Sequence, residues 1–137
     1  MDQLKTKTVN DIFNKIEGNY QSLQMQMGWS KAEPLENYYL KIDTNHIIWL
    51  YQKVTDKSNA HSLLYKFNME IINNNGILEV KTTLIYSNKT ELGFFDKDWL
   101  QGIFYVSTNY NKIMFGNDIE IDGGPSTTWK RTRVKFK

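Results

Sequence analysis

Residues 61–71 read HSLLYKFNMEI and carry the clearest structural signal in this 137-residue chain. Ser62, Lys66, Asn68 and Glu70 are interleaved with apolar and aromatic side chains. The residues expected to share one face are His61, Leu63, Tyr65, Phe67, Met69 and Ile71. Because successive side chains of a strand point to opposite faces, this alternation predicts a β-strand with one buried and one solvated face.

Turn signals follow this segment and recur along the chain. Asn73-Asn74-Asn75-Gly76 predicts a hairpin, since Asn and Gly tolerate positive φ. Thr44-Asn45 predicts a tight turn between alternating segments at 38–43 and 46–54. Further strands are expected at 18–27, 77–86, 102–108, 112–115, 119–121 and 127–136, while 92–100 is ambiguous. Eight to ten short strands joined by turns are typical of an antiparallel barrel or sandwich.

Helical periodicity is convincing at the N-terminus, over residues 2–16. The residues that gather on one stripe are Leu4, Val9, Ile12, Phe13 and Ile16. Thr8 suits an N-cap, and Gly18 is a typical helix terminator. A helix this short is marginal alone, so we expect it to pack on one end of the barrel.

The fold expected is therefore mainly β: an antiparallel up-and-down β-barrel of about eight strands with a short N-terminal helix. We expect a single domain over 1–137, with the helix at 2–16 and the barrel at 18–136. Hydrophobic residues make up 40% and charged residues 23%, as in ordinary globular proteins. The aromatic share of 14% favours strands and also suits the wall of a ligand cavity.

Charge and hydropathy restrict the classes of partner. The formal net charge of +2 is too balanced to indicate nucleic acid or an anionic membrane. No segment approaches the length of about 20 apolar residues that a membrane-spanning helix needs. The chain also begins without the apolar run of a signal peptide. A cytoplasmic location and an exported form with its leader removed, periplasmic or lipoprotein, both stay open.

No motif indicates catalysis. The chain has no cysteine, no Gly-x-Ser-x-Gly elbow and no phosphate-binding glycine loop. Its two histidines, His46 and His61, form no short-spaced ligand pair, so no metal site is expected. The sequence therefore predicts a protein that is not an enzyme, with no catalytic residues and no cofactor.

A barrel of about eight strands either fills with side chains or holds one small ligand. Broad aromatic residues on several predicted strands favour a cavity for a small hydrophobic or amphipathic molecule. The candidate ligand-binding residues are Trp49, Tyr65, Phe67 and Phe104. The alternative is a protein-interaction domain, of inhibitor or immunity type, with a filled barrel and contact loops at 29–35 and 91–99.

The two ends of the barrel segment carry motifs of a known family. Ile16-Glu17-Gly18-Asn19-Tyr20 and Trp129-Lys130-Arg131 resemble the opening and closing motifs of lipocalin and lipocalin-like (calycin-type) barrels. Asp122-Gly123-Gly124-Pro125 is similar to a C-terminal signature of small bacterial members, and Tyr20 replaces the commoner Trp. The resemblance implies that Gly18, Tyr20 and Arg131 close the barrel, with the Arg131 guanidinium over the Tyr20 ring.

Overall fold

The structure is a computed structural model that describes residues 11–27, 31, 33–53, 61–88, 97–107, 109–116 and 125–133. Several expectations lie outside these residues. They are the helix over 2–10 with its Thr8 cap, the strand at 119–121, the end of the final strand at 134–136, and most of the two predicted contact loops, including Trp29.

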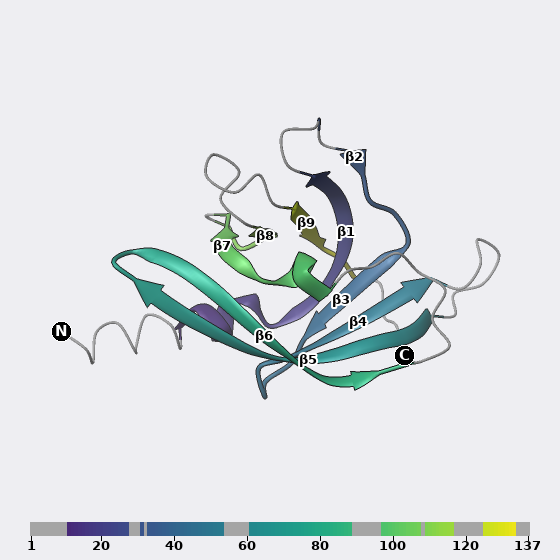
Figure 1. Ribbon diagram of the computed structural model, residues 1–137, viewed down its shortest axis with the longest axis horizontal. Helices are drawn as coiled ribbons and strands as arrows, with labels where there is room; N and C mark the ends of the chain where they lie inside the picture. Colours follow the sequence, from purple (N-terminus) through teal and green to yellow (C-terminus); the bar gives the residue numbers. More distant parts are fainter. Residues whose placement is uncertain are drawn as a thin grey trace.

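The described chain forms a closed antiparallel barrel that is preceded in the sequence by a short helix (Figure 1). Its elements are a helix over 11–16, the 3-10 helix η1 (Lys97–Leu100) and the strands β1 (Gly18–Met27), β2 (Glu33–Pro34), β3 (Tyr38–Ile42), β4 (Ile47–Lys53), β5 (His61–Asn74), β6 (Ile77–Ser87), β7 (Gly102–Val106), β8 (Lys112–Gly116) and β9 (Pro125–Arg131). Each strand from β3 to β9 pairs with the next, and β1 pairs with both β3 and β9. The two-residue β2 extends the β3 side of β1, so eight strands make the wall. The predicted fold class is confirmed.

Two predicted turns have the backbone that their residues favour. In the β5–β6 hairpin Asn75 and Gly76 both have positive φ, 55° and 92°. This is the requirement of a type I′ turn, whose twist matches that of the flanking strands. The Gly76 amide also donates to Asn73 Oδ1 at 2.9 Å. Between β3 and β4, Asp43 Oδ1 accepts from the amides of Asn45 and Ile47, which holds the tight turn.

Three β-bulges, in β1, β5 and β6, shift the faces that simple alternation predicts, and in β6 the extra residue is Ile85. In β1 the register moves at Leu23, so Tyr20 and Met25 lie on the same inner side although they are five residues apart. In β5 Leu64 is the extra residue. A bulge residue reverses the side-chain parity beyond it. The expectation that His61 shares a face with Tyr65 is therefore wrong, and the same holds for Leu63.

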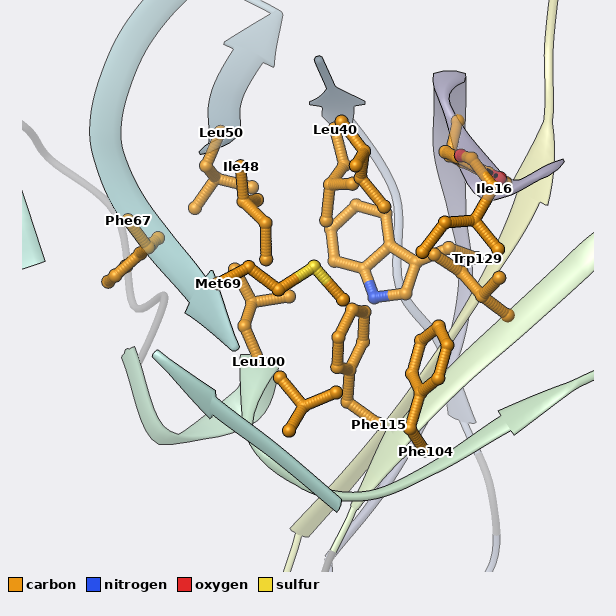
Figure 2. Close-up of a cluster of buried hydrophobic side chains, with 14 of the residues drawn as sticks. Ile16, Leu40, Ile48, Leu50, Phe67, Met69, Leu100, Phe104, Phe115 and Trp129 are labelled. Carbon is orange, nitrogen blue, oxygen red and sulfur yellow. Dashed lines mark hydrogen bonds between the residues drawn. The ribbon is translucent and has the colours of Figure 1, made fainter. Parts of the chain in front are cut away.

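The core extends from the end of the barrel nearest the helix to Tyr38 and Leu64 near the other end, and part of it is drawn in Figure 2. Ile16 seals the end nearest the helix and is fully buried, and Phe13 stacks on His46 with ring centroids 3.7 Å apart. The largest fully buried side chains are Trp129, Tyr20, Phe67, Phe115, Ile16, Leu40, Ile42, Ile48, Leu50, Leu64, Leu100 and Ile113. The expected docking of the helix stripe is present for its described part.

The ambiguous segment before β7 supplies part of this core. Leu100 of η1 is fully buried among side chains of the strands. Thr127 Oγ1 donates to the Trp99 carbonyl at 2.7 Å and accepts from Trp129 Nε1 at 3.0 Å. This chain of hydrogen bonds fastens η1 to β9 and pairs the polar atoms that Thr127 and Trp129 bring into the core.

Candidate ligand-binding site

The register shows which side chains of β3 to β6 face the interior, because cross-strand partners share a face. They are the alternate residues of β3 from Tyr38, of β4 from Ile48 to Gln52, of β5 from Tyr65 to Asn73, and of β6 from Leu78 to Leu84. None of these described positions is charged, and the charged residues of these strands lie at outer positions. This side of the interior is an uncharged wall.

Two of the candidate residues lie next to each other on β5. Tyr65 is opposite Leu50, and Phe67 is opposite Ile48. Their rings are 5.7 Å apart between centroids. Phe67 is 1% exposed and belongs to the core, whereas Tyr65 is half-buried and packs against the edge of that core. Tyr65 therefore lies at the edge of the filled core, and Phe67 lies within it.

Phe104 also faces inward, from β7. It is opposite Phe115 of β8, with ring centroids 5.2 Å apart, and it is buried in the same core cluster as Phe67. Three of the four candidates thus face the barrel interior, and the ring of Tyr65 is the one that stays partly accessible.

Trp49 is not brought together with the other three. Its neighbours Ile48 and Leu50 face inward, so Trp49 lies on the outer surface between Lys41 and Lys66 of the adjacent strands. The Lys66 ammonium lies 3.9 Å from the Trp49 ring centroid. Such a cation–π contact stabilises an exposed sheet face. The alternation over 46–54 indicates this position, because Ile48 and Leu50 on either side of Trp49 are the aliphatic residues that a core takes up.

Asp43 holds Trp49 in place from the β3–β4 turn. Its Oδ2 accepts from Trp49 Nε1 at 2.8 Å. Partial burial acts to raise the pKa of Asp43, but the hydrogen bonds from Trp49, Ile47 and Asn45 outweigh it and the pKa lies below its usual value. The arrangement is an ordered surface cluster rather than a part of the interior.

Leu84 is a feature of this wall that the sequence analysis missed. Along the inner face of β6, Val80 is buried, Thr82 is half-buried and Leu84 is 42% exposed. Yet Leu84 is opposite Phe67, which is buried. The inner face therefore becomes accessible to solvent along β6, next to Tyr65. Alternation through 77–86 places Leu84 inside, but its exposure follows from the tertiary pairing, in which β7 begins opposite Val80 and does not reach Leu84.

At the opposite end, Arg131 of β9 joins the first strand to the last. It is opposite Tyr20, and its guanidinium carbon lies 5.1 Å from the Tyr20 ring centroid. Nε donates to the Tyr110 carbonyl at 2.7 Å and Nη1 to the Glu17 carbonyl at 2.9 Å, while Nη2 donates to the Lys15 carbonyl. One side chain thus links β9, the β7–β8 turn and the end of the helix.

Gly18 and Tyr20 complete this cluster. Gly18 has φ of 144°, and a Cβ atom there would lie 2.5 Å from Arg131 Nη1. The Tyr20 hydroxyl donates to the Ile16 carbonyl at 2.6 Å and is buried. Arg131 therefore lies against both of the other residues that the family resemblance singles out, and we propose that the three hold the barrel closed.

Because the Tyr20 hydroxyl is buried, the free energy of unfolding should fall at alkaline pH. Burial raises its pKa from 10.0 to about 12, although the Arg131 charge acts to lower it. Because the folded pKa is the higher one, the stabilisation is present below pH 10 and is lost as the pH rises toward 12. Urea unfolding between about pH 9.5 and about pH 11.5 should therefore show a steeper loss for wild type than for Tyr20→Phe. If the free energy of unfolding falls equally with pH in the two proteins, the raised pKa is not that of Tyr20.

The described residues show no grouping for metal chemistry. In them, no three His, Asp or Glu side chains come together. His46 stacks on Phe13 before β4 begins, whereas His61 contacts Tyr39 beside the end of β4, so the two lie at opposite ends of that strand. No helix in the described part of the chain is long and apolar enough to cross a membrane.

The comparisons with known proteins agree with this architecture. A lipocalin-like protein from Bacteroides uniformis, known from a crystal structure, superimposes with a TM-score of 0.57. The match covers 86% of this chain and 99% of that one at 13% sequence identity. No protein-family model and no curated protein sequence matches the chain. The chain therefore has a lipocalin-like fold.

Proposed function

We propose that this protein binds a small apolar or amphipathic molecule inside its barrel, without catalysis. The observation that carries the proposal is the partly accessible, uncharged inner wall around Tyr65 and Leu84, beside a core that is otherwise closed. An apolar surface with a few polar groups is the usual character of a small-molecule site. The lipocalin-like fold supports the same proposal.

Binding would be driven by removing apolar surface from water. Tyr65 offers a broad ring for contact and a hydroxyl that can orient a polar group. The buried rings of Phe67 and Phe104 would form the inner limit of the ligand site. Trp49 lies outside the wall and takes no part in this proposal.

A fluorescent neutral probe tests the proposal. N-phenylnaphthylamine should bind saturably with one site per chain, and Tyr65→Ala should weaken binding by about tenfold through lost ring contact. Tyr105→Ala is the matched control, because Tyr105 points outward from β7 and is 53% exposed. The proposal would be contradicted if the wild-type protein gave no saturable increase in fluorescence. It would also be contradicted if Tyr65→Ala and Tyr105→Ala lost the same amount of affinity for the probe.

A protein-interaction role with a filled barrel is the second candidate. It is favoured by the packed core near the helix and by outward side chains such as Tyr105 and Ile77, which stay exposed. Saturable binding of the neutral probe separates the two candidates, since a filled barrel has no room for it. Trp99 gives the alternative little support, because it packs against the core.

A further inference from the structure

The β5–β6 turn contains the single Asn-Gly pair of the sequence, at Asn75-Gly76. Both residues are exposed, and a Cβ atom built on Gly76 would meet no described atom within 4 Å. Asparagine is among the chemically labile residues of proteins. Glycine has no side chain to shield its own nitrogen, which is therefore open to the carboxamide of the preceding residue. The residue types and the open surroundings favour a reaction between the two.

A third group controls the nitrogen that would react. The Gly76 amide donates a hydrogen bond to Asn73 Oδ1 at 2.9 Å. Attack on the Asn75 side chain requires this amide to lose its proton and to turn away from the Asn73 oxygen. The φ values of 55° at Asn75 and 92° at Gly76 belong to a tight two-residue turn, which restricts that rotation. The reaction therefore requires local opening of the turn.

We propose that Asn75 is a site of spontaneous deamidation, and that the Asn73 carboxamide sets the rate by holding the Gly76 amide. In the first step the Gly76 nitrogen bonds to Asn75 Cγ and the Cγ–Nδ2 bond breaks. The amide proton passes through solvent to Nδ2, which leaves as ammonia. Water then adds to either carbonyl of the cyclic imide. One opening gives aspartate at residue 75, and the other gives isoaspartate, with the backbone running through the former side chain.

The two products differ in their effect on the hairpin. Aspartate tolerates positive φ as asparagine does, so it keeps the turn and adds one negative charge. Isoaspartate adds a methylene group to the backbone of a two-residue loop. Because the loop fixes the register of a hairpin, isoaspartate should disturb the pairing of Asn74 with Ile77.

Incubation of the folded protein in mildly alkaline buffer tests the site. Peptide mass mapping should find a carboxyl in place of the carboxamide at residue 75, and isoaspartyl methyltransferase should label the isoaspartate product. Wild type in concentrated urea should react at least about fivefold faster, because the turn is then open. A folded protein that forms no carboxyl at residue 75 overturns the proposed site.

Variants of Asn73 test the control of the rate. Asn73→Ala should raise the rate about fivefold, because the turn opens more readily without the hydrogen bond. Asn73→Asp keeps an acceptor oxygen and should stay within about twofold of wild type. Asn68→Ala is the matched control, since Asn68 is exposed on the outer face of the same strand.

The rates decide whether Asn73 has this role. Equal rates for Asn73→Ala and Asn68→Ala overturn it, as does a rate for Asn73→Asp that is as high as that for Asn73→Ala. Exchange of the Gly76 amide hydrogen, measured by NMR, should rise in Asn73→Ala by the same factor as deamidation. Should Asn73→Ala fail to fold, equal rates in folded and urea-unfolded wild type would still overturn protection by the turn.

Discussion

Gly18→Ala should lower the free energy of unfolding by about 2–4 kcal/mol, because two costs act together. The backbone at Gly18 has φ of 144°, which side chains other than glycine rarely adopt. The new methyl group would also lie 2.5 Å from Arg131 Nη1. That nitrogen is held by the Glu17 carbonyl and cannot move away without losing a charge-assisted hydrogen bond. Chemical denaturation measures the change.

A double-mutant cycle with Arg131→Ala separates the two costs. Removing the guanidinium removes the clash but leaves the backbone strain, so Gly18→Ala should cost less in the Arg131→Ala background. The matched control is Gly76→Ala in the β5–β6 turn, where φ is also positive but no atom lies within 4 Å. If the two substitutions change the free energy of unfolding additively, the Arg131 guanidinium is not the reason that residue 18 must be a glycine.

Trp129→Ala should be the most destabilising single substitution considered, at about 3–5 kcal/mol. Trp129 is 0% exposed at the centre of the core, and its ring contacts would be lost to a cavity that neighbouring strands cannot close. Its Nε1 also donates to Thr127 Oγ1, which in turn holds η1. Loss of the indole therefore weakens the hydrogen-bonded attachment of η1 to β9 as well as the packing of the core.

Trp49→Ala is the control for this prediction. Trp49 lies on the outer face and is stabilised by cation–π contact with Lys66 and a hydrogen bond to Asp43, so its loss should cost only about 1 kcal/mol. Urea unfolding measures both changes. If Trp129→Ala and Trp49→Ala lowered the free energy of unfolding by similar amounts, the placement of Trp129 in the core and Trp49 on the outer surface would be contradicted.

The fold was predictable because two independent signals agree. Turn residues such as Asn75-Gly76 punctuate segments that alternate, and the motifs around Tyr20 and Arg131 indicate that the first and last strands meet. The bulges at Leu23 and Leu64 were not predictable in the same way. Both are ordinary strand-forming leucines, and the shift arises only when a strand is matched to its partner.

The candidate site was predictable in part for a related reason. Tyr65, Phe67 and Phe104 were chosen as aromatics on strands, and strand parity determined that they point inward. Trp49 was chosen for its ring alone, against the parity of Ile48 and Leu50. Leu84 was missed because its exposure depends on where β7 begins along β6, opposite Val80, which is a property of tertiary pairing that no local pattern encodes.

The pairing of β1 with β9 also bears on how the chain folds. Tyr20 and Arg131 become neighbours only after the intervening chain has been arranged. Bringing such distant segments together costs loop entropy before their contacts can repay it, and proteins dominated by such pairings fold slowly, in milliseconds to seconds. The hairpins are therefore expected to form early, with the meeting of the first and last strands as the late event.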